Sequence, residues 1–154
     1  MEASLITDEV RALVGMTSKP VSVQLTKHHV RKALYAVRGR KDLEVNDGDP
    51  APFAALGAIE GDAEPLQTPT LMPKFMIISN EWSFERPLVV GETYTCVRRL
   101  ADISERLGGR FGYSIYIRSD VEFSDSTGAL VARSGTQVMQ FDPANERRDA
   151  GADE

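Results

Sequence analysis

Cysteine, tryptophan and histidine are scarce in this sequence of 154 residues, which has one, one and two of them, respectively. The single cysteine, Cys96, excludes an internal disulfide and any metal site built from several cysteines, and we expect neither metal nor cofactor. No apolar run approaches the roughly 20 residues that a membrane span requires, and no basic, apolar leader is visible at the N-terminus. These absences favour a cytoplasmic protein in a reducing compartment without a membrane partner.

An excess of positive charge is also lacking, since 23 acidic residues outnumber 18 basic ones and give a net charge of -5. This balance argues against a nucleic-acid partner. The charge is unevenly placed, because residues 27–41 hold basic side chains and no acid, whereas residues 42–64 hold acids and no base. Such blocks are usually solvated faces. The alternative is a basic patch for a phosphorylated ligand, with Arg31 and Lys32 as candidate phosphate contacts.

Length and hydrophobic content predict one globular domain over residues 1–141. Residues 142–154 are polar and without periodicity, and we expect them to form a disordered acidic tail.

The first third of the chain carries clear local signals. Thr7 or Asp8 can cap a short helix over residues 9–14, and residues 21–25 alternate as a strand. Thr26 stands at an N-cap position, and Gly39 can end the helix that follows. Apolar residues recur along this helix with the spacing of one face, at Val30, Ala33, Leu34 and Val37.

The middle of the chain predicts a buried helix, and the remainder predicts a sheet. Thr68 and Pro69 can begin a helix through Ile78 that is apolar almost all round, which is typical of a helix inside a protein. Strands are expected around residues 82–84, 94–106, 111–123 and 130–141. A long antiparallel meander must bury its apolar face. We therefore expect an α+β chain with a single hot-dog domain, in which the sheet wraps around a central helix, rather than a lipocalin-like barrel.

Three segments carry a resemblance to a known family. Residues 84–92 (F-E-R-P-L-V-V-G-E) resemble the F-x-R-P-[IL]-x-x-G-[DE] signature of MaoC-like dehydratases. Residues 66–71 (L-Q-T-P-T-L) and 125–131 (D-S-T-G-A-L-V) fit in order and spacing. More narrowly, the chain resembles the N-terminal dehydratase domain of that group.

The resemblance implies a reaction and a catalytic motif. The reaction is the reversible addition of water to a trans-2-enoyl thioester of coenzyme A or acyl carrier protein. Active members carry G-D-x-N-P-x-H, in which Asp and His activate the water. Here Asp49 matches, but Ala51 and Ala54 replace the Asn and His. Loss of a general acid/base typically costs 10²–10⁴ in rate, so Asp49 is only a weak catalytic candidate and no catalytic residue is assigned.

These observations favour the non-catalytic subunit of a heteromeric enoyl-CoA hydratase, paired with a second hot-dog subunit that carries the Asp/His motif. Such a subunit would shape an acyl tunnel for a fatty, bulky or steroid-like thioester in lipid metabolism. The candidate tunnel residues are Thr70, Leu71, Phe75, Met76 and Trp82. Arg86 is a third candidate phosphate contact, although beside Pro87 it can equally brace a turn. The alternatives are a non-enzymatic acyl-thioester-binding module and, ranked third, a thioesterase, for which Glu64 is the acid close in sequence.

Overall fold

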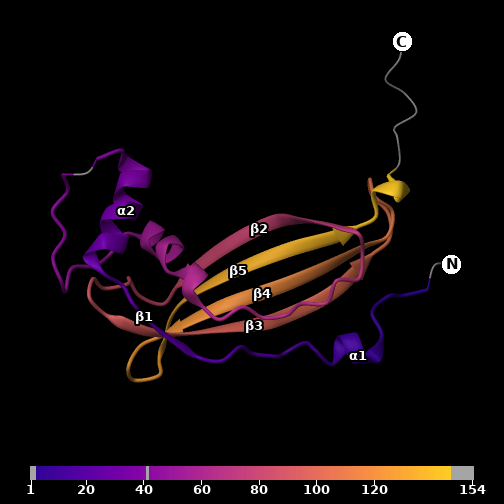
Figure 1. The fold of residues 1–154 in the computed structure, drawn as a ribbon, viewed down its shortest axis with the longest axis horizontal. Coiled ribbons are helices and arrows are strands. Elements are labelled where there is room, and N and C mark those ends of the chain that lie inside the picture. Colours follow the sequence, from indigo (N-terminus) through magenta and orange to yellow (C-terminus); the bar gives the residue numbers. More distant parts are fainter. Residues whose placement is uncertain (1–2, 41, 147–154) are drawn as a thin grey trace, which may run out of the picture.

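The computed structural model of the chain describes residues 3–40 and 42–146. Its centre is one five-stranded antiparallel sheet with the order β1-β3-β4-β5-β2 (Figure 1). The strands are β1 (Val21–Gln24), β2 (Lys74–Phe84), β3 (Thr93–Arg106), β4 (Ser114–Ser124) and β5 (Leu130–Phe141). The short β1 and the long β2 therefore form the two edges of the sheet.

Helices are few and lie mainly in the first half of the chain. They are the α-helices α1 (Asp8–Arg11) and α2 (Lys27–Arg38) and the 3-10 helices η1 (Phe53–Ala58), η2 (Glu60–Asp62) and η3 (Pro143–Asn145). The capping prediction for α2 is confirmed at both ends. Thr26 and His29 form a reciprocal capping box, and Gly39 ends the helix with a left-handed φ of 66°.

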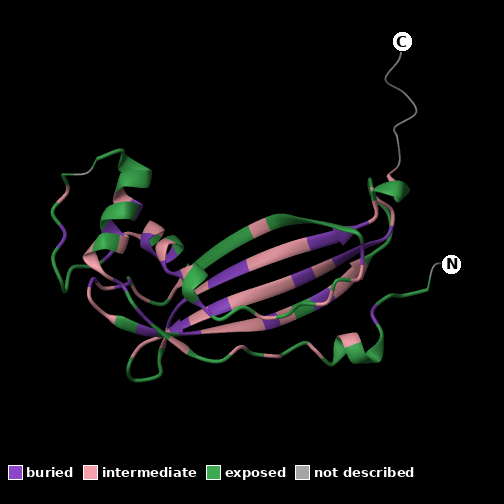
Figure 2. Ribbon diagram, in the orientation of Figure 1, coloured by how far each residue is buried: buried purple, intermediate pink, exposed green. Residues whose placement is uncertain are grey.

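The helix predicted over residues 68–78 is wrong. Its first part is an extended connection, and from Lys74 onward the chain is the edge strand β2, paired on one side with β5. When nearly every residue of a segment is apolar, its hydrophobic pattern has no period, and the pattern cannot distinguish a buried helix from a strand. Moreover, this segment is not buried, because Phe75 and Ile77 are 71% and 60% exposed. Figure 2 shows β2 as the most exposed of the long strands.

Two apolar clusters pack against the inner face of the sheet, defined here as the face of Cys96, Val121 and Ala132. At one end, α2, η1 and η2 cover this face and supply Val30, Leu56 and other buried residues. At the other end, Ile6 and Met72 pack with residues of β3 and β4, partly covered by the N-terminal segment and residues 66–72. The middle of the inner face is left to the connection between η2 and β2, which crosses the sheet (Figure 1).

The C-terminal residues continue past β5 into η3, and Glu146 forms an ion pair with Arg110. The rest of the predicted tail, residues 147–154, lies outside the described residues, as does Lys41 of the basic run. None of the helices formed by the described residues has the length and hydrophobicity that a bilayer span requires.

Candidate functional site

A cavity of about 470 Å³ lies in the middle of the inner face of the sheet. Strands β3, β4, β5 and β2 form its floor, and the connection from η2 to β2 forms its wall. Its lining is mostly apolar or hydroxylic and consists of Pro65, Leu66, Thr68, Thr70, Met72, Pro73, Phe75, Arg98, Ile117, Ser119, Thr136, Val138 and Gln140. An apolar cavity of this size with a few polar groups suits a small organic ligand. It includes two of the predicted tunnel residues, Thr70 and Phe75.

Gln140 on β5 fixes the wall of this cavity. Its side-chain oxygen accepts hydrogen bonds from the main-chain N–H groups of Leu71 and Met72, at 2.8 and 3.2 Å. Its side-chain nitrogen donates to the main-chain oxygen of Pro69 at 2.8 Å. Gln140 is buried, so each of these bonds satisfies a group with little access to water. Residues 69–72 are therefore held over the sheet by one side chain.

The other three predicted tunnel residues lie around the cavity rather than in its lining. Leu71 packs against the second apolar cluster, and Met76 pairs with Met139 on the opposite face of the sheet. Trp82 lies further along β2, where its indole nitrogen donates to Glu60 at 3.0 Å. Its ring rests on Gly57, where a Cβ would come within 3.2 Å.

Glu60 is a carboxylate of the inner face that the sequence analysis missed. Besides the indole, the same Glu60 oxygen accepts a hydrogen bond from the buried Ser134 hydroxyl at 2.5 Å. The sequence directed attention to Glu64, but the structure uses the main-chain oxygen of that residue, which accepts from Arg98. Because Glu60 is held by two donors, it ties η2 to β2 and β5.

Asp49 lies at a second, separate cavity of about 420 Å³ between α2 and residues 44–53. Its carboxylate accepts a hydrogen bond from the main-chain N–H of Asn46 at 3.1 Å, which is a turn contact. Both histidines lie at the start of α2, where His28 is exposed and His29 forms the capping box. No histidine is therefore found among the described lining residues of the cavity that includes Asp49.

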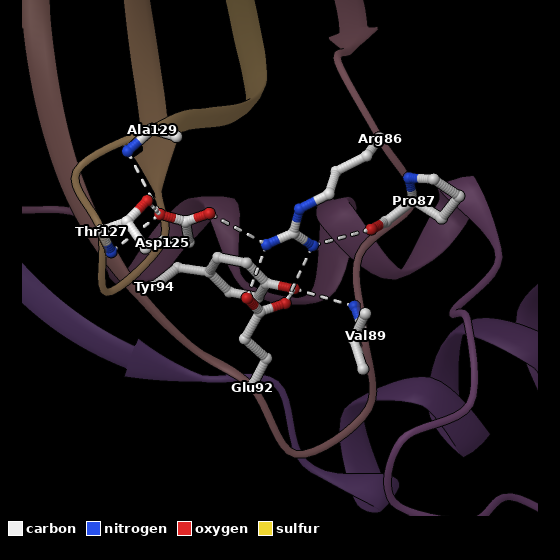
Figure 3. Close-up of polar contacts among 8 residues, drawn as sticks. All are labelled: Arg86, Pro87, Val89, Glu92, Tyr94, Asp125, Thr127 and Ala129. Atoms are coloured by element: carbon white, nitrogen blue, oxygen red, sulfur yellow. Dashed lines mark hydrogen bonds and ion pairs between the residues drawn. The ribbon is translucent and has the colours of Figure 1, made fainter.

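Arg86 is held by carboxylates of its own chain (Figure 3). Its guanidinium donates to both oxygens of Glu92, at 2.6 and 3.0 Å, and to Asp125 at 3.3 Å. The hydrogen bond from Arg86 holds the pKa of Glu92 below its ordinary value, and burial raises the pKa of Tyr94 to about 12. This geometry favours the bracing role for Arg86 over a phosphate contact.

The other two candidate phosphate contacts lie far from the sheet cavity in the fold. Arg31 and Lys32 are exposed on α2, which lies beyond one end of the sheet (Figure 1). Arg38 of the same helix lines the second cavity. The two cavities share no lining residue, so the basic run and the larger cavity are separate features.

The family is decided by a match over most of the chain. A family model described as "FAS1-like, dehydratase domain region" matches residues 12–134. The chain belongs to this family. A comparison with curated proteins found no match to this chain.

Several solved structures share the fold of this chain, although each is less than 25% identical to it. The chain resembles a chain of the truncated HadBC (3R-hydroxyacyl-ACP dehydratase) complex from Mycobacterium tuberculosis, with 14% identity over 82% of this chain and 96% of that chain and a TM-score of 0.58. It also resembles a chain of the ChsH1-ChsH2 complex from the same organism, with 15% identity over 95% and 93% and a TM-score of 0.59. A MaoC-like dehydratase from Rhodospirillum rubrum gives 15% identity over 88% and 94% and a TM-score of 0.54. The α+β hot-dog fold of MaoC-like dehydratases is therefore confirmed.

Proposed function

We propose that this chain is the acyl-binding, non-catalytic subunit of a heteromeric hot-dog hydratase, of the N-terminal dehydratase-domain type. The observation that carries the proposal is a cavity without an acid/base pair. Within the described residues, no histidine and no carboxylate lines the 470 Å³ cavity. Asp49 accepts a turn hydrogen bond from Asn46, and Ala54 stands where the motif has histidine. A chain built this way can bind an acyl group but has no group at that cavity to move the proton of water.

In the proposed complex the two subunits divide the work. A second hot-dog subunit with the G-D-x-N-P-x-H motif activates the water and adds it reversibly across a trans-2-enoyl thioester. This chain encloses the apolar acyl group, excludes bulk water from it and orients it for attack. Positioning of this kind contributes to rate because the reacting atoms are held near the geometry of attack. Either coenzyme A or acyl carrier protein can present such a thioester, and both belong to the proposal, as does a cytoplasmic location.

Strand β2 supplies the surface for the second subunit. It lies at an edge of the sheet, so one side of its backbone has no strand partner among the described residues. Four consecutive exposed residues on it are apolar, at positions 75–78. Natural proteins protect long apolar edges, because exposed edges attract other chains. Pairing of β2 with a hot-dog partner would cover this edge and extend the rim of the cavity at Phe75.

A non-enzymatic acyl-thioester-binding module is the second candidate function. It is favoured by one observation, which is that a cavity lined by no histidine and no carboxylate among the described residues can hold an acyl group without converting it. In that case the chain would bind the acyl thioester with no catalytic partner. The hydration assay below separates the two functions.

The test is hydration of a short and a bulky enoyl-CoA by this chain alone and by its mixture with a hot-dog chain that carries the intact motif. The proposal predicts no hydration by the lone chain and hydration of the bulky substrate by the mixture. A partner in which the motif histidine is replaced by alanine is the matched control and should leave the mixture inactive. Full activity of the lone chain would contradict the proposal, and binding without activity in any mixture would favour the module.

A further inference from the structure

Arg98 is a charged side chain on the inner face of the sheet, in a row that is otherwise buried. It lies on β3 between Cys96 and Leu100, both of which are fully buried on the inner face. Its register partner on β4 is Val121, another buried residue of that face. Arg98 lines the 470 Å³ cavity and is the one charged residue in its described lining.

The guanidinium of Arg98 has no carboxylate partner within the described residues. Its Nε donates to the main-chain oxygen of Glu64 at 3.3 Å, and neither of its two Nη groups has a described partner. The next residue, Arg99, points to the opposite face and forms an ion pair with Glu122 at 3.7 Å. Because an arginine side chain carries five N–H donors and stays charged, Arg98 retains both donors and charge for a ligand.

Hydroxyl groups continue this polar region across the sheet. Ser119 on β4 pairs with Leu100 of β3 and with Thr136 of β5, so Ser119 and Thr136 lie side by side on the cavity floor. The Thr136 hydroxyl donates to Asn80 on β2 at 2.9 Å. The Ser119 hydroxyl has no partner among the described residues and lies diagonally across from Arg98.

We propose that the cavity binds a carboxylate carried on an apolar body, with the carboxylate on the Arg98 guanidinium and a hydrogen bond from Ser119. The planar fork of arginine matches the two oxygens of a carboxylate. A monoanion is neutralised by the single cation of the lining, whereas a phosphate monoester carries about -1.5 to -2 charges at pH 7 and would leave an uncompensated charge in the cavity. The inference concerns this cavity alone and does not depend on pairing with a catalytic subunit. If the ligand is an acyl thioester, its acyl group carries a carboxylate.

Three probes with the same number of carbon atoms test the inference on the full chain, by isothermal titration calorimetry at pH 7. They are dodecanoate, dodecanol and dodecyl phosphate. Dodecanoate should bind about tenfold or more tightly than dodecanol, since a hydrogen bond to a charged group is worth more than a neutral one. It should also bind about tenfold or more tightly than dodecyl phosphate, whose second charge the single cation of the lining leaves uncompensated. Arg98→Gln should remove the preference for dodecanoate over dodecanol, and Arg98→Lys should keep part of it.

The matched control is Arg99→Gln, which removes a positive charge from the neighbouring position on the opposite face. It should leave the preference unchanged, and thermal unfolding of each variant checks that it folds. Measurements on the wild-type chain alone can overturn the inference. They would do so if dodecanoate and dodecanol bound equally, if dodecyl phosphate bound more tightly than dodecanoate, or if dodecanoate did not bind. A mixture that hydrates enoyl-CoA while the chain shows no carboxylate preference would overturn this inference and leave the proposed function standing.

Discussion

The side chain of Gln140 on β5 accepts a hydrogen bond from the main-chain N–H of Leu71 at 2.8 Å. The two residues are 69 positions apart in the sequence, yet this contact and the bonds to Met72 and Pro69 hold the wall of the main cavity onto its floor. Cavity shape therefore depends on a polar contact as well as on apolar packing.

Replacement of Gln140 by leucine should lower the free energy of unfolding by about 1–3 kcal/mol, because it leaves three buried or half-buried main-chain groups without their partner. Urea unfolding measures this change. Gln137→Leu is the control, since Gln137 lies on the same strand but not in the cavity lining, and it should change stability by no more than about 0.5 kcal/mol. Equal effects of the two replacements would contradict the clamping role of Gln140.

The cluster formed by Arg86, Glu92, Tyr94 and Asp125 predicts that stability depends on pH. The pKa of Glu92 is lowered mainly by Arg86, and that of Asp125 mainly by the Thr127 hydroxyl, with Arg86 adding to it. A carboxyl with a lowered native pKa stabilises the fold above its unfolded pKa, near 4.5 for Glu92 and 3.8 for Asp125. This stabilisation is lost as the pH falls through the native value. The free energy of unfolding should therefore decline as the pH falls below about 5.

Arg86→Gln tests this origin of the pH dependence. It should lower stability at pH 7 by about 1–2 kcal/mol, given the partial exposure of the cluster, and make the decline with acid shallower. Urea unfolding from pH 7 to pH 3 gives both quantities. Arg31→Gln, which removes an exposed charge on α2, is the matched control. An unaltered pH slope in Arg86→Gln would show that the cluster does not set it.

Cys96 should be unreactive in the folded chain. It is buried, and burial, with a smaller contribution from the nearby Asp62 carboxylate, raises the pKa of its thiol to about 12. Since the thiolate is the nucleophile, a thiol reagent at pH 8 should react orders of magnitude faster after unfolding in urea than before it. Rapid labelling of the native chain would contradict the placement of Cys96 in the core.

The exposed edge of β2 should be required for assembly but not for folding. The double replacement of Ile77 and Ile78 by lysine puts two charges on this edge, and lysine on an edge strand opposes pairing. We expect the complex with the second hot-dog chain to dissociate into separate subunits. Light scattering, which gives the molecular mass in solution, measures this dissociation. The control is lysine at Ser22 and Gln24 on the opposite edge strand β1, which should leave the mass unchanged. Dissociation by the β1 variant, or none by the β2 variant, would place the interface elsewhere.

Much of the fold could be predicted from the sequence where local chemistry decides it. The ends of α2 follow from Thr26 and Gly39, and the alternation of apolar residues, interrupted at Ser119, gives the buried face of β4. The segment at residues 74–78 could not be assigned in this way. Its side chains are apolar on both faces of an edge strand, and a continuous apolar run has the same appearance in a strand and in a buried helix.

The lining of the candidate site could be predicted only in part. Thr70 and Phe75 line the cavity, and both could be named from the sequence because they lie in residues 66–71 and in the apolar run that follows. Arg98 and Gln140 were missed because β3 and β5 were treated as plain strands. The signal was present, since the alternation of Tyr94, Cys96 and Leu100 puts Arg98 on the apolar face. The clamp by Gln140 could not be predicted, because it joins residues far apart in the chain.

The most direct test of the account is a titration of this chain into a fixed amount of the motif-bearing hot-dog subunit, followed by the rate of hydration of a bulky enoyl-CoA. The account predicts that the rate rises with added chain and levels off at an equimolar ratio, while this chain alone gives no hydration. Hydration by this chain alone at the rate of the mixture would contradict it.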